Sequence, residues 1–173
     1  MIHKNSQKRI IVPNAIYFVT TNTYNKFQYF KNVRITHQLI KDIWYVQRVK
    51  SFELFGYKIN PDHIHILIQP KVENISECMR SLKTNSSRNI NKLIISELEQ
   101  MSSSNLKARS RDRAFKVDKV FLSIPPFKWQ KSYIDHIIRG EQDFIQHLKY
   151  LQNQSVKHNL TENKYLYINP NVF

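Results

Sequence analysis

The pattern of apolar and polar residues over positions 15–70 predicts a strand, a helix and then two further strands. Residues 15–24, AIYFVTTNTY, are rich in β-branched and aromatic side chains and predict the first strand. Apolar residues then recur every three or four positions over 33–52, which predicts an amphipathic helix. Strands are predicted at 53–60 (ELFGYKIN) and 63–70 (HIHILIQP), and the short turn between them makes these two strands antiparallel.

The second half of the chain predicts two more helices and one more strand. Residues 74–100 predict a long helix that begins near Asn74 or Ser76. The aromatic and β-branched residues of 127–139 predict a last strand, and 140–159 predict a third helix that starts after Gly140. The tail, KYLYINPNVF, is expected to be extended or irregular.

The resulting order, β-α-β-β-α-β followed by a helix, is typical of an α+β fold of the ferredoxin-like or RRM-like kind. Such a fold has an antiparallel sheet with helices on one face, and we expect its other face to be open to a ligand. Many proteins that bind single-stranded nucleic acid use that face.

Composition agrees with a single folded domain that binds a polyanion. The length of 173 residues predicts one domain over 1–173, and a hydrophobic content of 41% is enough to form a core. Lysine and arginine number 27 against 13 aspartates and glutamates, and this net charge of +14 favours nucleic acid over an anionic membrane as partner. Residues 101–119 are rich in Ser, Lys and Arg and predict a mobile basic insertion.

Several function classes are excluded by what the chain lacks. Only two glycines occur, so glycine-rich phosphate loops and dinucleotide-binding motifs are absent. The single cysteine, Cys78, excludes an internal disulfide and a cysteine-rich zinc site. No apolar run approaches the roughly 20 residues of a membrane span, so we expect no membrane partner and a cytoplasmic location.

Two histidines on one predicted strand are the first candidates for chemistry. His63 and His65 lie two positions apart, so on a strand their side chains point to the same face. Neutral imidazole is the commonest metal ligand in proteins, and two such groups could converge on one ion. The alternative is a half-exposed strand whose histidines bind nothing.

The predicted third helix carries a polar strip beside its apolar face. At helical spacing the core-facing positions are Phe144, Leu148, Leu151 and Ser155, and the polar strip contains Asp143, His147, Tyr150 and Gln154. The strip could be only a solvated side of the helix. Alternatively, Tyr150 and Gln154 could face the same metal as the two histidines. A tyrosine can attack a phosphodiester, and a divalent ion can neutralise the phosphate; Mg²⁺ or Mn²⁺ suits this role, although histidines alone would favour Zn²⁺.

Several ordered motifs resemble one family. The stretch PDHIHILI resembles the two-histidine HUH motif of single-strand DNA transposases. FKWQKSYIDHIIRGEQDFIQHLKYLQNQSVKHNL resembles the C-terminal signature of the REP-associated tyrosine transposases, with Trp129-Gln130, the run from Asp135 to Arg139, and Tyr150 in matching order. MRSLKTNSSRNIN resembles the lysine-bearing second helix of that family. The resemblance spans most of residues 10–160.

The chain departs from the family pattern at three places. Gln154 stands where the relatives have Asn, and Ser155 stands where they have Pro. A Gln four residues after the tyrosine is instead typical of the broader insertion-sequence transposases. The basic stretch over 101–119 is longer than usual.

The resemblance implies a single HUH transposase domain. We expect a metal-dependent single-strand DNA endonuclease and strand transferase, acting through a covalent 5′-phosphotyrosine on hairpin-bearing repeat DNA. Tyr150 would be the nucleophile, and His63, His65 and Gln154 would hold Mg²⁺ or Mn²⁺. The protein would be a monomer or homodimer in a prokaryotic cytoplasm, associated with the nucleoid.

Further residues are candidates for supporting the site or binding DNA. His136 and His147 could support the site, although His136 could be a buried hydrogen-bonding residue and His147 a helix-surface residue. Basic side chains would contact phosphates and aromatic ones could stack on bases, unless the aromatics belong to the core. The candidate DNA-binding residues are Lys83, Arg88, Lys92, Trp129, Lys131, Tyr133 and Arg139, with Lys107, Arg109, Arg111 and Arg113 in the insertion. Tyr133 is also a rival nucleophile.

Three other functions remain open from the sequence. A replication-initiator or relaxase-type nickase would share the metal and the tyrosine. A non-catalytic domain that binds single-stranded nucleic acid would explain the charge and aromatics but not the metal ligands. A phosphodiesterase that uses water would need the histidines but not Tyr150.

Overall fold

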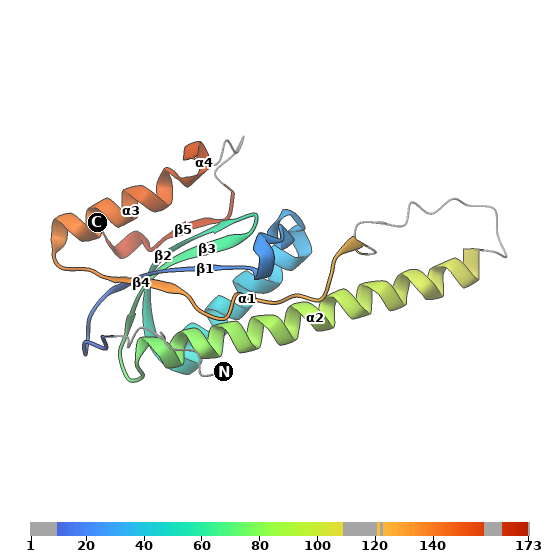
Figure 1. The fold of residues 1–173 in the computed structure, drawn as a ribbon, viewed down its shortest axis with the longest axis horizontal. Helices are drawn as coiled ribbons and strands as arrows, with labels where there is room; N and C mark the ends of the chain where they lie inside the picture. Colours follow the sequence, from blue (N-terminus) through green and yellow to red (C-terminus); the bar gives the residue numbers. More distant parts are fainter. Residues whose placement is uncertain (1–9, 109–120, 122, 158–163, 173) are drawn as a thin grey trace, which may run out of the picture.

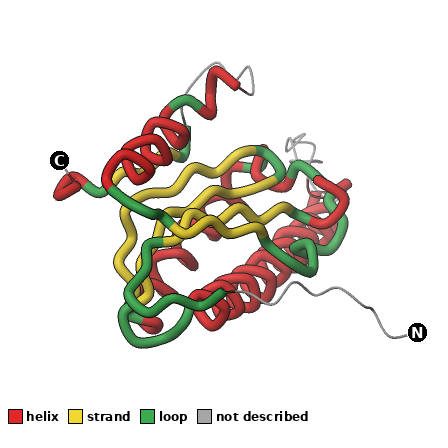
Figure 2. The backbone as a smooth tube through the Cα atoms, turned by 60° about the vertical axis from the view of Figure 1, so that its left-hand side comes forward, coloured by secondary structure: helices red, strands yellow, loops and turns green. Residues whose placement is uncertain are grey.

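The computed structural model describes residues 10–108, 121, 123–157 and 164–172, and for 101–108 the backbone alone. One five-stranded antiparallel sheet, in the order β4-β1-β3-β2-β5, forms its centre (Figures 1 and 2). The strands are β1 (Tyr17–Asn22), β2 (Phe52–Asn60), β3 (His63–Pro70), β4 (Ile134–Ile137) and β5 (Leu166–Ile168). The helices are α1 (Val33–Lys50), α2 (Ile75–Ala108), α3 (Glu141–Gln152) and α4 (Gln154–Lys157). The α+β fold class and the order of the first six elements are confirmed.

Helices lie on both faces of the sheet, which differs from the expectation of one open face. Figure 1 shows α1 and α2 on one side of the strands and α3 on the other. On β3, Ile64, Ile66 and Ile68 belong to the large core under α1 and α2, whereas Leu67 packs with Leu148 and Leu151 of α3. The face that was expected to be open is therefore covered by α3 along part of its length.

Local capping explains why α1 begins and ends where the sequence predicted. The Asn32 side chain accepts hydrogen bonds from the backbone N–H groups of Arg34 and Ile35, at 2.9 and 3.2 Å. This satisfies two of the donors that have no partner within the first turn. The helix ends at Ser51, whose φ of 49° and ψ of 50° are left-handed. Strand β2 starts at the next residue.

Helix α2 is longer than predicted. The Asn74 carboxamide accepts from the Glu77 N–H at 3.0 Å near its start, as expected for a cap. The helix then continues through Ala108 instead of ending near residue 100. Its sequence contains neither Gly nor Pro, so nothing in it interrupts the backbone hydrogen bonds. The predicted basic insertion thus begins inside α2, and the rest of it, 109–119, lies outside the described residues.

The C-terminal part differs most from the prediction. Only Ile134–Ile137 of the predicted strand at 127–139 pairs along β1, although Trp129 forms an isolated bridge with Thr23. The predicted third helix is divided at Asn153 into α3 and α4, and its last residues, 158–159, lie outside the described residues. The tail was expected to be extended or irregular, and Leu166–Ile168 of it forms β5 along the edge of β2.

Gly56 allows α3 and β5 to approach β2 closely. A Cβ atom at this position would lie 2.9 Å from the backbone oxygen of Tyr167 and 3.1 Å from Cδ1 of Leu151. The first separation is too short for any side chain, so a residue larger than glycine would displace the backbone of β5, and the Leu151 side chain would have to adjust. The pairing of β2 with β3 also shifts register between Leu54 and Gly56, at a bulge. No helix in the described part of the chain is both long enough and apolar enough to cross a membrane.

Candidate active site

The sheet face under α3 changes from apolar to polar along its strands. Residues paired across antiparallel strands point to the same face. Phe18 pairs with Leu67 and His136, and these side chains lie in the row that α3 covers. On the three central strands the next two rows of this face are polar. They are Thr20, His65 and Lys58, flanked by Ile134 and Leu166 on the edge strands, and then Asn22, His63 and Asn60.

Each histidine of β3 is held in place through its Nδ1 atom. His63 Nδ1 lies 2.6 Å from Oδ1 of Asp62, and His65 Nδ1 lies 2.8 Å from Oγ1 of Thr20. Such hydrogen bonds fix the orientation of the ring and are the usual support of metal-binding histidines. Their Nε2 atoms point into the protein, where His65 is only 4% exposed. Asp62 lies in the turn between β2 and β3, and its contact with His63 adds a role that the sequence did not indicate.

Gln154 closes this group from the helical side. It is the first residue of α4 and is 1% exposed. Its Oε1 lies 3.2 Å from His65 Nε2 and accepts from Asn60 Nδ2 at 3.3 Å, while its own Nε2 donates to the backbone oxygen of Tyr150 at 3.2 Å. Asn60 Nδ2 in turn lies 3.0 Å from His63 Nε2. Gln154 therefore meets His65 and Asn60, which lie 89 and 94 positions earlier in the chain.

The separation of His65 Nε2 from Gln154 Oε1 fits two neighbouring ligands of a divalent cation. Neighbouring ligands on an octahedral ion with bonds of about 2.1 Å lie roughly 3 Å apart. The observed separation of 3.2 Å between His65 Nε2 and Gln154 Oε1 is close to that value. When His65 carries its proton on Nδ1, beside Thr20, both atoms present lone pairs to each other. Two imidazoles and an amide oxygen could thus hold a cation.

Tyr150 lies beside this group. Its ring meets the ring of His65 edge-on, with centroids 5.2 Å apart, and also contacts Phe18. Lys157 donates to the Tyr150 hydroxyl, with 3.1 Å between Nζ and the oxygen. Lys157 was not among the residues predicted for the site, although Tyr150, Gln154 and Lys157 follow the i, i+4, i+7 spacing of one helix face.

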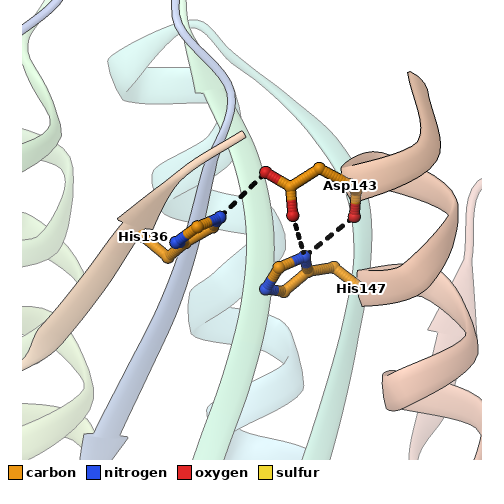
Figure 3. A group of neighbouring side chains, drawn as sticks. All are labelled: His136, Asp143 and His147. Carbon is orange, nitrogen blue, oxygen red and sulfur yellow. Dashed lines mark hydrogen bonds and ion pairs between the residues drawn. The ribbon is translucent and has the colours of Figure 1, made fainter. Parts of the chain in front are cut away.

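A second cluster joins β4 to α3 through one carboxylate (Figure 3). Asp143 Oδ2 lies 2.8 Å from His136 Nε2, and Asp143 Oδ1 lies 3.0 Å from His147 Nδ1. The Arg139 N–H also donates to Asp143, and this bond, together with that of His136, lowers the pKa of the Asp143 carboxyl. The three ligand atoms lie within 4.8 Å of one another, so this cluster could also hold a metal ion. It adjoins the first group, since Phe18 contacts both His65 and His147.

The candidate DNA-binding residues lie in different settings. Trp129 is 8% exposed and its indole donates to Ser86, which fits the core alternative better than base stacking. Lys83 donates to the backbone oxygens of residues 130–132, so it supports the segment before β4. Tyr133 is half-buried, and its hydroxyl donates to Ser76 of α2, away from the histidines. Four further candidates are exposed: Arg88, Lys92, Lys131 and Arg139. The side chain of Lys107 and all of Arg109, Arg111 and Arg113 lie outside the described part of the chain.

Lys58 is a further polar residue that the sequence did not single out. It is 1% exposed and donates a hydrogen bond to the backbone oxygen of Lys164. Burial lowers the pKa of its ammonium group. Lys58 stands beside His65 in the register, so a buried amine adjoins the site.

Comparison with known proteins identifies the class of this chain. Residues 11–106 match the family described as "Transposase IS200 like", which is more than half of the chain. The chain therefore belongs to the IS200-like transposase family. The matched region contains His63 and His65 but ends before Tyr150 and Gln154.

Within that class, the chain is similar to REP-associated tyrosine transposases, which confirms the resemblance seen in its motifs. A Haemophilus influenzae protein that carries this name as a provisional designation is 29% identical over 113 residues, covering 64% of this chain and 53% of that protein. The chain thus spans about half the length of this curated relative. The solved structure of a REP-associated tyrosine transposase bound to a REP hairpin has the same fold, with a TM-score of 0.62 and 18% identity; the match covers 91% of this chain and 76% of that one.

Proposed function

We propose that the chain cleaves and rejoins single-stranded DNA, with Tyr150 as the nucleophile. The observation that supports this most directly is the meeting of the Tyr150 ring with the His65 ring, at a centroid separation of 5.2 Å. A strand bearing two imidazoles and a helix bearing a phenol come together within one chain. The relative solved with a REP hairpin makes a hairpin with flanking single strand the natural substrate to test.

In the proposed reaction the phenol oxygen of Tyr150 attacks a DNA phosphate. The new O–P bond forms as the bond to the 3′ oxygen breaks, which leaves a 5′-phosphotyrosine and a free 3′ hydroxyl that takes up the phenol proton. Attack by a second 3′ hydroxyl on the phosphotyrosine reverses this exchange and rejoins DNA. One phosphodiester is replaced by another throughout, so no external energy source is needed.

His63, His65 and Gln154 would hold Mg²⁺ or Mn²⁺. When bound, the ion would neutralise charge on a non-bridging phosphate oxygen. Asp62 and Thr20 keep the two imidazoles oriented through Nδ1, at 2.6 and 2.8 Å. Lys157, 3.1 Å from the phenol oxygen, would orient that oxygen and compensate negative charge that develops on it.

The other predicted residues have narrower roles in this proposal. His136 and His147 act through Asp143, which ties α3 to the sheet edge and so keeps Tyr150 near β3. Exposed Lys131 and Arg139 are the best placed to contact DNA on the α3 side, because they flank β4. Arg88 and Lys92 are exposed on α2, in the layer on the other side of the sheet, and would reach only DNA that passes around an edge. Three statements stay predictions: that the chain forms one domain over 1–173, that it is a monomer or homodimer, and that it acts at the nucleoid in the cytoplasm.

The test is a search for a covalent protein–DNA adduct. Labelled single-stranded oligonucleotides, with and without a hairpin, are incubated with the protein and Mg²⁺ or Mn²⁺ and separated on a denaturing gel. We expect an adduct with the wild-type chain and none with Tyr150→Phe, while Tyr133→Phe serves as the matched control and keeps the adduct. An adduct that persists in Tyr150→Phe refutes the assignment. Cleavage by Tyr150→Phe without any adduct would favour a phosphodiesterase that uses water.

A further inference from the structure

Asn60 lies between the imidazole and amide groups described above. It is the last residue of β2 and is 1% exposed. Its amino group, Nδ2, lies 3.0 Å from His63 Nε2 and 3.3 Å from Gln154 Oε1. Its carbonyl oxygen, Oδ1, is buried and has no hydrogen-bond partner among the described residues. A buried carbonyl without a partner is unusual and calls for an explanation.

The two possible orientations of this amide have opposite requirements. Rotation of a carboxamide by about 180° exchanges its oxygen and its amino group with little change of shape. With the amino group inward, its hydrogens satisfy the lone pairs of His63 and Gln154, but the oxygen is left without a partner. With the oxygen inward, Asn60 Oδ1 faces His63 Nε2 and Gln154 Oε1. These three acceptors repel one another unless a cation lies between them.

We propose that Asn60 is a fourth protein ligand of the cation and that its amide turns when the cation binds. This inference rests on the proposed function, because it assumes the ion held by His63, His65 and Gln154. In the metal-free protein the amino group occupies the gap between the donor atoms. In the metal-bound protein the carbonyl oxygen faces the ion, and the amino group points to where Oδ1 now lies.

The chemistry of the donor set follows from this change. Two imidazoles and two amide oxygens are a harder set of ligands than two imidazoles and one amide. Oxygen ligands favour Mg²⁺ and Mn²⁺, whereas nitrogen-rich sites favour Zn²⁺. Asn60 would therefore bias the site toward the ions that suit phosphate chemistry.

The experiment measures Mn²⁺ binding to the full chain, from the loss of the free Mn²⁺ signal in electron paramagnetic resonance. Asn60→Leu keeps the approximate shape of the side chain and removes its oxygen. We expect it to weaken Mn²⁺ binding roughly tenfold or more, the range seen when partners of metal sites are removed. Asn60→Asp supplies a charged oxygen at the same place and should bind Mn²⁺ at least as tightly as the wild type.

A matched control is available on the other side of His63. Asn22 pairs with His63 from β1, as Asn60 does from β2, but its amide donates to Gln130 at 3.3 Å. Asn22→Leu should leave the Mn²⁺ affinity unchanged. Circular dichroism and a thermal melt establish that each variant is folded, and Asn60→Asp remains informative if Asn60→Leu is not.

The outcomes separate this inference from the proposed function. Wild-type affinity in Asn60→Leu, together with lost binding in His63→Ala, overturns the role of Asn60 and leaves the cation site intact. Weaker binding by Asn60→Asp than by the wild type also overturns it. If the wild-type chain binds no Mn²⁺, both the cation site and the role of Asn60 fall.

Discussion

Alternate residues of the same strands point to the two faces of the sheet, yet one face packs into an apolar core and the other carries the polar groups of the candidate site. On β3, Ile64, Ile66 and Ile68 are almost completely buried under α1 and α2. His63 and His65, which alternate with these isoleucines in sequence, point to the other side, where a phenol and a carboxamide arrive from α3 and α4. The period of two in a strand thus places a core side chain and a side chain of the proposed site at neighbouring positions. Adjacent substitutions should therefore separate stability from activity.

The largest expected effect is on the α1 and α2 face. Ile66 is 0% exposed, and Ile66→Ala removes buried methyl groups and leaves a cavity. Substitutions of this kind cost about 2–5 kcal/mol of stability. Denaturant unfolding measures the loss, and the folded fraction should still bind Mn²⁺ like the wild type. A loss of Mn²⁺ binding in folded Ile66→Ala would mean that the two faces are not independent.

The matching change on the other face is His65→Ala. Removal of this proposed ligand should reduce the rate of DNA cleavage at least about a hundredfold, which corresponds to about 2.7 kcal/mol in the barrier. The loss of stability should be smaller than that of Ile66→Ala, and DNA binding should persist. Single-turnover cleavage and an unfolding curve measure the two quantities. EDTA should abolish cleavage by the wild type, and normal turnover in EDTA would rule out the metal.

Lys157→Met tests the contact with the phenol. The variant keeps the length of the aliphatic chain but loses the ammonium group that donates to the Tyr150 hydroxyl at 3.1 Å. We expect adduct formation about tenfold slower, or about 1.4 kcal/mol in the barrier, with unchanged Mn²⁺ affinity. Lys157→Arg should recover part of the rate. An unchanged rate in Lys157→Met would leave this contact without a role in the attack.

The smallest effect concerns a carboxylate inside the α1 and α2 layer. Asp42 is 2% exposed, and burial raises its pKa despite hydrogen bonds from Asn89 and Gln38. A raised pKa means that the contribution of Asp42 to stability is present below the ordinary carboxyl pKa of about 3.9 and is lost as pH rises through the folded-state pKa. Asp42→Asn should therefore melt roughly 2 °C higher than the wild type at neutral pH, with no gain at acidic pH.

Asp143→Asn is the control for the melting temperature of Asp42→Asn, because the pKa of Asp143 is shifted in the opposite direction. The pKa of Asp143 is lowered, so its contribution is present above the ordinary carboxyl pKa and is lost as pH falls through the lower, folded-state pKa. This variant should gain no stability at neutral pH. A higher melting temperature in Asp143→Asn than in Asp42→Asn would contradict the reasoning for both residues.

The first half of the fold could be read from the sequence because its signals are local. The apolar spacing of α1, the cap at Asn32 and the turn before His63 each involve a few neighbouring residues, and their boundaries were nearly correct. The three residues of β5 carry no such signal, since they become a strand only by pairing with the edge of β2. The end of α2 differs from the prediction because the change to a polar composition after residue 100 does not end a helix that contains neither Gly nor Pro.

The candidate site was predictable to a similar, partial degree. The spacing of His63 and His65 and the polar strip of α3 pointed to groups that do come together. No local pattern indicated a role for Asn60, Asp62 or Lys58, because a strand followed by a turn accounts for residues of these types. Their part in the site depends on strand register, which places Asn60 opposite His63 and Lys58 opposite His65.

The absence of a side chain at Gly56 lets β5 and the helix that carries Tyr150 pack closely on β2. Leu151, which would lie 3.1 Å from a Cβ atom there, is the residue directly after Tyr150. A methyl group at position 56 would collide with the backbone oxygen of Tyr167, which would have to shift, and would press on the end of the Leu151 side chain, which could adjust. The close packing of β5 and α3 on β2 thus depends on a position whose only contribution is that it leaves room for its neighbours.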